Sequence, residues 1–139
     1  MAITLNNKVG LKINAVDLSD HVTSVTLNQS ADELEVTAMG DLAHKFVKGL
    51  ESATLTVSFL NDQAATSVLD TLSDAFGTTV AFKMVQDKVP AVSATNKLFT
   101  GDILINNLTP INGAVGDMST QDITFTVNSV VTVADSGTF

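Results

Sequence analysis

Strict alternation between apolar and polar residues dominates two neighbouring stretches of the chain. In the first stretch, Leu34, Val36 and Ala38 alternate with polar residues. The second stretch is longer, and its apolar positions are Ala53, Leu55, Val57 and Phe59. Alternation with a period of two predicts antiparallel strands that are buried on one face. The segment 32–60 is therefore predicted to be a long β-hairpin with a loop over residues 41–50.

Shorter alternating segments predict further strands on both sides of this hairpin. They cover residues 9–13, 22–29, 79–86, 98–108 and 122–133. The last of them is expected to form one long strand. A polar turn at residues 30–32 is expected to lead into the hairpin. Residues 87–97, which include Pro90, are predicted to be irregular or to form an edge strand.

The apolar period changes directly after the hairpin. Apolar residues then follow helical spacing, at positions 65, 68, 69, 72, 75 and 76. This spacing predicts an amphipathic helix over residues 62–76. Asn61 or Asp62 can cap its first turn, and Gly77 suits the left-handed position that ends a helix.

Together these elements predict a mainly β protein. We expect a two-sheet antiparallel β-sandwich or barrel, with the helix covering one open side. The length of 139 residues predicts a single domain over residues 1–139. Within it, residues 1–8 are expected to form an N-terminal arm. The C-terminal tail, residues 135–139, is expected to be loose unless a partner holds it.

Composition narrows the function mainly by exclusion. The chain has no cysteine, which excludes disulfides and thiolate metal sites. Its first residues lack the apolar run of a signal peptide, and no stretch approaches the roughly 18 apolar residues of a membrane span. The chain is therefore expected to be made and folded in the cytoplasm.

The charge balance argues against recognition of nucleic acids. The formal net charge is −8, and all seven basic residues are lysines. Without arginine the chain lacks the bidentate donor that suits phosphate and guanine, so binding through a basic patch is not expected. The absence of Trp and Tyr also argues against sugar-binding and antibody-like surfaces.

No residue pattern indicates catalysis, a cofactor or a metal. His21 and His44 lie in different predicted loops, and neither has the neighbours of a catalytic triad. Carboxylates could be considered as calcium ligands, namely Asp17, Asp20, Asp32, Glu33 and Glu35. No glycine-containing calcium loop surrounds them, so a solvated surface is the better interpretation. There is also no phosphate-binding loop, and we do not expect an enzyme.

The polar faces of the long strands, by contrast, are unusual because they carry few charges. They are rich in Thr, Ser and Asn, as in Thr54, Thr56 and Ser58 and again in Thr124, Thr126 and Asn128. One explanation is that Thr has a high β propensity. The other is that these faces or edges contact further copies of the chain, since monomeric proteins usually protect sheet edges with charge.

Several short runs together resemble a known family. They are Thr37-Ala38-Met39-Gly40-Asp41, then Gly49-Leu50, then Phe59-Leu60-Asn61-Asp62 ahead of the predicted helix. In this order the sequence resembles the major tail tube proteins of bacteriophages with long, non-contractile tails (siphovirus type). The resemblance extends over about residues 9–133 and is best over 17–76.

The resemblance implies a structural virion protein that is assembled in the cytoplasm of a bacterial host. Such proteins are β-sandwiches with a flanking helix, and their inner sheets join in a hexameric ring around a lumen. The rings stack into the tail tube, through which DNA passes at ejection without specific binding. Implied partners are further copies of the chain and the tape measure, tail terminator and distal tail proteins, with no membrane.

Mapped by position, the resemblance places the contact between rings in the hairpin loop. The candidate residues are Gly40, Asp41, His44, Lys45, Phe46, Val47, Lys48 and Gly49. Phe46 and Val47 would be apolar anchors, Lys45 and Lys48 would face acidic residues, and the two glycines would permit sharp exits from the loop. The alternative for Phe46 is that it packs back onto its own core.

Other functions stay open. The chain could be a different virion component, such as a tail terminator or a capsid decoration protein, or part of a secretion tube related to tail tubes. It could also be an immunoglobulin-like binding module. The helix in mid-chain and the absence of Trp and Tyr argue against the binding module.

Overall fold

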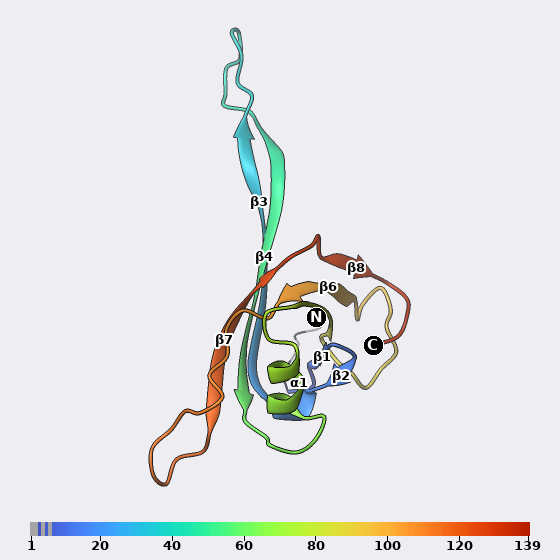
Figure 1. The fold of residues 1–139 in the computed structure, drawn as a ribbon. Coiled ribbons are helices and arrows are strands. Elements are labelled where there is room, and N and C mark those ends of the chain that lie inside the picture. Colours follow the sequence, from blue (N-terminus) through green and yellow to red (C-terminus); the bar gives the residue numbers. More distant parts are fainter. Residues whose placement is uncertain (1–2, 4, 6) are drawn as a thin grey trace.

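The computed structural model describes residues 3, 5 and 7–139 and shows a curved antiparallel sheet from which a long hairpin projects (Figure 1). Its described elements are β1 (Gly10–Ile13), β2 (Val16–Asp17), the 3-10 helix η1 (Ser19–His21), β3 (Val22–Glu35), β4 (Phe46–Leu60), α1 (Val68–Asp74), β5 (Thr79–Val85), β6 (Leu98–Leu104), β7 (Thr120–Val127) and β8 (Thr132–Ala134). The predicted mainly β, antiparallel fold with one flanking helix is confirmed.

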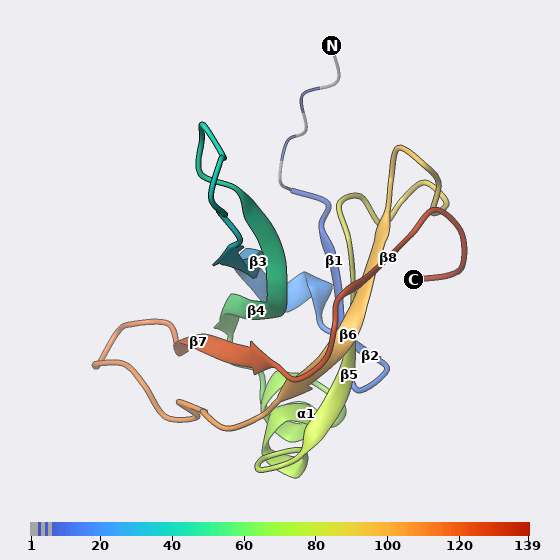
Figure 2. The same ribbon diagram turned by 90° about the horizontal axis from the view of Figure 1, so that it is seen from above.

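The two predicted layers are halves of one hydrogen-bonded sheet. The strand order is β2-β1-β5-β6-β7-β4-β3, and β8 pairs with β6. The halves meet where β6 pairs with β7, through Ile103 with Val127 and Leu104 with Thr126. In Figure 2 the β3-β4-β7 half and the β1-β5-β6 half lie on opposite sides of the interior, and α1 closes the space between them at one end.

The core lies between these halves, as the alternation predicts. Its fully buried side chains come from β1, β4, β5, β6, β7 and the helix, and include Leu11, Leu55, Val57, Phe59, Leu72, Phe82, Ile103, Ile123 and Phe125. Burial of such side chains contributes about 1.5–3 kcal/mol each. Because β4 pairs with both β3 and β7, this apolar packing also fixes the register of the hairpin.

The helix is shorter than predicted. α1 covers Val68–Asp74 rather than residues 62–76. The carboxylate of Asp62 accepts hydrogen bonds from the N–H of Ala64 and the hydroxyl of Ser67, both at 2.9 Å. These bonds hold the preceding residues in a loop instead of a helical turn. Gly77 does adopt the left-handed conformation expected beyond the helix, with φ of 82°.

The predicted turn at residues 30–32 and the predicted loop limits are wrong. β3 runs through residues 30–32 without interruption, and β4 begins at Phe46, so the loop covers residues 36–45. A β-bulge absorbs the irregularity, because Ala31 pairs with Glu51 whereas Glu33 pairs with Lys48. The pairing therefore continues on both sides of one extra residue in β4.

The last strands also differ from the prediction. The expected strand over 122–133 is divided into β7 and β8, and the strand expected over 98–108 ends at Leu104. At the break, the N–H of Asn128 donates to the carbonyl of Asp102 at 2.7 Å, and the N–H of Asp102 donates to the Ser129 hydroxyl at 2.9 Å. These bonds turn the chain away from β4 and lead it along the same edge of β6, where β8 pairs with residues 98–100.

The C-terminal tail is docked rather than loose. The ammonium group of Lys12 donates to the Phe139 carbonyl at 2.7 Å and lies 4.7 Å from the centre of its ring. A Cβ at Gly10 would come within 2.7 Å of that ring, so the glycine makes room for it. Of the predicted N-terminal arm, residues 1, 2, 4 and 6 lie outside the described residues, and Ile3 and Leu5 are exposed.

We predict that Phe125→Ala lowers the free energy of unfolding by about 3–5 kcal/mol, because a fully buried ring leaves a cavity. The neighbouring Thr124 lies on the opposite, exposed face of β7, so Thr124→Val should change it by less than about 1 kcal/mol. Urea unfolding followed by circular dichroism measures both. Equal losses in the two variants would contradict the assigned faces.

Candidate functional site

The outer part of the β3–β4 hairpin carries apolar side chains that nothing in the described chain covers. Burial along β4 begins only at Ala53, and beyond this point the two strands project from the core as a ribbon (Figure 1). We call residues 34–50 the hairpin tip. Its exposed large apolar residues are Leu34, Val36, Met39, Leu42, Phe46, Val47 and Leu50. A contiguous apolar surface of this kind is typical of a contact with another protein.

Phe46 and Val47 are exposed as the anchor role requires. Their exposed fractions are 56% and 47%, which excludes the alternative that Phe46 packs back onto its own core. The two side chains point to opposite faces of the ribbon because they are consecutive in a strand. Val47 pairs with Leu34, and Phe46 pairs with Glu35. Both faces of the hairpin tip thus present apolar groups.

A turn closed by Asp41 shapes the end of the hairpin tip. The Asp41 carboxylate lies 2.8 Å from the Lys45 ammonium and accepts from the Ala38 N–H at 2.8 Å. The hydrogen bond from Lys45, followed by that from Ala38, holds the pKa of Asp41 below its ordinary value. Gly40 adopts a φ of 90°, which confirms a sharp turn at this glycine.

Both lysines of the hairpin tip have partners within the hairpin itself. Lys45 pairs with Asp41, and Lys48 lies 2.6 Å from the carboxylate of Glu51. The two lysine side chains are nevertheless well exposed, and an exposed ion pair contributes only about 0–1 kcal/mol. The pairs can therefore exchange partners at low cost when another acidic surface approaches.

Two other candidate residues have roles that differ from the prediction or extend it. Gly49 does not form an exit from the loop; it lies inside β4 at the bulge. A Cβ at this position would come within 3.0 Å of the Asp32 Cβ, so the close approach of β3 requires glycine. His44 lies 2.5 Å from the Glu35 carboxylate and ties the loop to the end of β3.

Sequence reasoning missed most of the exposed apolar residues of the hairpin tip. Leu34 and Val36 belong to an alternating pattern that predicts a buried face. Their strand passes beyond the edge of the core, where no second layer covers that face. The excess of apolar residues over residues 34–50, which also include Met39 and Leu42, was the available signal.

A second feature is a polar face with few charges on the three strands β3, β4 and β7, directed away from the core. The register places its polar side chains in three rows across the strands. The rows are Ser24–Ser58–Asp122, Thr26–Thr56–Thr124 and Asn28–Thr54–Thr126. We call these nine residues the polar grid. Asp122 is its one charged member, and the hydroxyls of Thr56 and Thr124 lie 3.1 Å apart.

The polar grid lies between two sheet edges that carry no strand partner in the described part of the chain. β3 is the last strand of the sheet. On the far side, β7 pairs with β6 only through Thr126 and Val127. Its edge over residues 120–125 has no strand partner, although the Asn112 side chain donates to the Thr120 carbonyl at 3.0 Å. Open edges present unpaired backbone donors and acceptors and are ready to pair with another chain.

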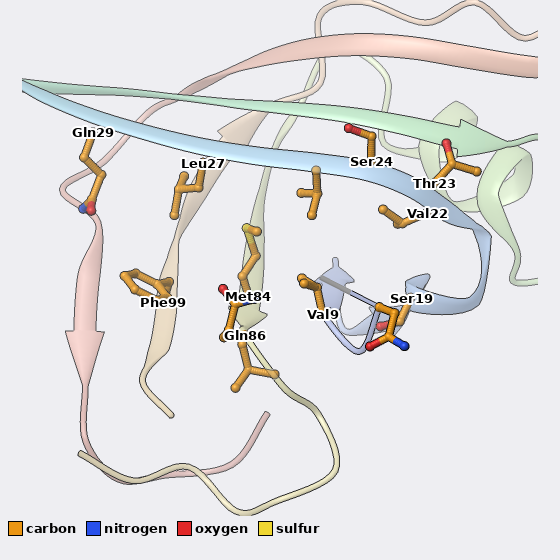
Figure 3. Close-up of a pocket in the computed structure, with 13 residues that line it drawn as sticks. Val9, Ser19, Val22, Thr23, Ser24, Leu27, Gln29, Met84, Gln86 and Phe99 are labelled. Carbon is orange, nitrogen blue, oxygen red and sulfur yellow. The ribbon is translucent and has the colours of Figure 1, made fainter. Parts of the chain in front are cut away.

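A groove in the described part of the chain is lined by no acidic or basic side chain. It has a volume of about 510 Å³ and lies between β3 and the β1-β5-β6 half of the sheet. Figure 3 shows its mixed lining, in which apolar residues such as Val9, Leu27 and Phe99 lie beside polar ones such as Ser19 and Gln29. Within the described residues, no three His, Asp or Glu side chains are grouped so that they could hold a metal ion.

The two histidines are not brought together. His21 pairs with Asp62 at 2.8 Å beside the helix, whereas His44 lies beyond the other end of β3. Among the described helices, none combines the length and hydropathy that a membrane crossing requires.

Comparison with known proteins finds a similar fold among solved structures but no sequence match. No protein-family model matches the chain, and no curated protein sequence matches it. Among solved structures, the chain is similar to a chain from "Virion of native gene transfer agent (GTA) particle". The two are 12% identical in sequence, the match covers 95% of this chain and 99% of the other, and the TM-score is 0.75. The two chains therefore share a fold over nearly their whole lengths.

We predict that the Ala38 amide resonance titrates with a midpoint below pH 3.8, the ordinary pKa of an aspartate. Because the pKa of Asp41 is lowered in the folded state, its contacts are complete above pH 3.8. They are lost as the pH falls through the lowered pKa. NMR titration of the protein measures this midpoint, and Asp41→Asn should abolish the transition. A midpoint at or above 3.8 would contradict the Asp41 turn.

Proposed function

We propose that this protein is a structural component of a phage-like virion, and specifically the subunit of a tail tube. The observation that carries the proposal is the projecting hairpin tip, whose apolar side chains have no cover within the described chain. Support also comes from the shared fold with a chain of a virion, the gene transfer agent particle. In this function the copies form hexameric rings, and the rings stack into a tube for DNA ejection.

The polar grid and its open edges support ring formation. A closed ring of identical subunits uses a heterologous contact, in which one surface meets a different surface of the next copy. The edges of β3 and β7 are two such surfaces on one sheet. Pairing between them would continue the sheet from copy to copy through backbone hydrogen bonds. The polar grid would then face the lumen of the ring.

A lumen lined by the polar grid would not retain DNA. Affinity for phosphates comes mainly from Lys and Arg, and the grid contains neither. A hexameric ring would carry a net charge of about −48, because each copy carries −8, so its field would repel DNA rather than bind it. We infer a conduit without specific DNA binding, and we do not propose an enzymatic activity.

The hairpin tip would mediate stacking between rings. Phe46 and Val47 present apolar groups on the two faces of the ribbon, so the tip can insert between surfaces of a neighbouring ring. The remaining partners would be the tape measure, tail terminator and distal tail proteins. In the proposed function the protein resides in the virion tail, after assembly in the bacterial cytoplasm.

A second candidate is another component of the same kind of particle, such as a tail terminator or a capsid decoration protein. It is retained because the shared fold points to a virion as a whole and not to one of its components. If the isolated chain forms tubes of stacked rings, this would distinguish a tube subunit from these alternatives.

We predict that the double variant Phe46→Asp/Val47→Asp folds normally but forms no tubes. Both residues lie outside the core, so folding should be retained, whereas charge at both anchors removes the apolar contact between rings. Negative-stain microscopy of concentrated protein gives the readout. A matched control is Val89→Asp/Val130→Asp, which adds the same charge at exposed valines elsewhere and should assemble like the wild type. Tubes at wild-type levels from the first variant would exclude the stacking role.

We also predict that Thr56→Cys becomes protected from bulky reagents on assembly. The chain has no native cysteine, so the new thiol is the single site of reaction. A maleimide coupled to a large polyethylene glycol should label it in the monomer and fail to label it in closed tubes. The control Thr95→Cys, in the exposed loop between β5 and β6, should stay reactive in both. Equal labelling of Thr56→Cys in monomer and tube would contradict a luminal polar grid.

A further inference from the structure

Stacked rings require two different surfaces on each copy, one at each end, because an open heterologous contact joins unlike patches. The hairpin tip supplies one of them. β4 defines the direction, since it begins in the tip at Phe46 and ends at Leu60, where it pairs with Thr120. Its 15 residues extend over roughly 50 Å at about 3.3 Å per residue. The second surface is therefore expected at the Leu60 end.

That end carries the loop between β6 and β7, the orange loop below β7 in Figure 1. We call residues 109–119 the base loop. Three large apolar side chains project from it, since Ile111 is 94% exposed, Val115 106% and Met118 70%. No other described part of the molecule outside the hairpin tip presents three such residues within so short a segment.

Hydrogen bonds at its root hold the base loop in place. The Asn61 side chain, directly after β4, donates to the Ser119 hydroxyl at 2.8 Å, and the Asn61 N–H donates to the Ser119 carbonyl at 3.0 Å. The Thr109 N–H donates at 3.1 Å to the side chain of Gln121, which is fully buried. The apolar residues are therefore exposed on a loop that hydrogen bonds hold in place.

The charges of the two ends differ in a way that favours contact between them. The hairpin tip, residues 34–50, contains two lysines, one aspartate and one glutamate and is neutral overall. Residues 19–21, 60–77 and 105–122, which lie at the Leu60 end, contain six aspartates, one histidine and no lysine. The tip thus brings two exposed lysines to a surface rich in aspartate, whereas two Leu60 ends would repel each other.

We propose that the base loop is the receptor for the hairpin tip of a second copy in the adjacent ring. This inference rests on the proposed tail tube function and names the surface that the tip binds. Phe46 and Val47 lie on opposite faces of the inserted tip, so one face packs against Ile111 and Val115 and the other against the adjoining surface of the same ring. The exposed lysines of the tip exchange their own carboxylate partners for Asp117 and its acidic neighbours. The contact is directional, so it propagates along the tube axis.

The test uses two variants that each retain one half of the contact. The tip-defective variant is Phe46→Asp/Val47→Asp, and the base-defective variant is Ile111→Asp/Val115→Asp. Neither pair of residues is buried, and circular dichroism with thermal unfolding verifies that both variants fold like the wild type. Val89→Asp/Val130→Asp again serves as the matched control for added charge and should form tubes.

Each defective variant alone should form no tubes. When the two are mixed, the intact tips of one can bind the intact base loops of the other, and growth then stops. Sedimentation velocity should show a new species of twice the mass of the species that either variant forms alone. This complementation distinguishes a specific contact from a general loss of assembly.

The outcomes separate this inference from the proposed function. Wild-type protein that forms no tubes at any concentration overturns the tail tube function and the inference with it. Wild-type tubes together with normal tubes from the base-defective variant overturn the inference alone. A mixture without the doubled species does the same, because the tip then binds a different surface or a different protein.

Discussion

Pairing between β3 and β4 is the interaction on which the rest of the structure depends. One end of this pair lies in the core, where β4 buries Leu55, Val57 and Phe59. The other end projects into solvent as a two-stranded ribbon, which is marginally stable when it is isolated. The buried end fixes the register, and the register extends along the same two strands into the hairpin tip. A protein that presents a long, exposed hairpin thus requires a strand that belongs to both regions.

The same strand pair carries the features that favour assembly. Strands that end a sheet are usually protected by charge, bulges or short length, because an open edge pairs readily with other chains. β3 is 14 residues long, and its outward residues over the core are Ser24, Thr26 and Asn28. Over the core this edge is therefore neutral, whereas its outer part carries Asp32, Glu33 and Glu35. In the proposed ring, the neutral part of this edge would be the surface through which one sheet continues into the next.

The direction of β4 links the two proposed contacts, because the hairpin tip lies at its start and the base loop at its end. The hairpin tip and the base loop both expose apolar side chains, and the uneven distribution of lysines gives the two ends different electrostatic character. Ion pairs within the tip, such as Lys45 with Asp41, order the free hairpin. Because these pairs are exposed and weak, the lysines can still bind other carboxylates. An end-to-end contact can then form by exchange of partners, with little loss of electrostatic energy.

Much of the fold could be predicted from the sequence, because alternation with a period of two reports directly which face of a strand is buried. The strand faces of β4 and β7 and the helix at Leu72 follow from local patterns alone. The residues at which the helix and the strands begin and end could not be predicted in the same way. The carboxylate of Asp62 binds Ala64 and Ser67 and shortens the helix, and pairing with β4 carries β3 through the polar residues 30–32.

The candidate site shows the same division. The sequence by itself determined that Phe46, Val47 and the lysines lie in one hairpin, that the polar strand faces carry few charges, and that no catalytic or metal-binding pattern is present. Only the tertiary structure decided that Leu34 and Val36 are exposed and that the base loop lies at the opposite end from the hairpin tip. The reason is physical: alternation defines a face of a strand, but whether that face is covered depends on where the second layer of the protein ends.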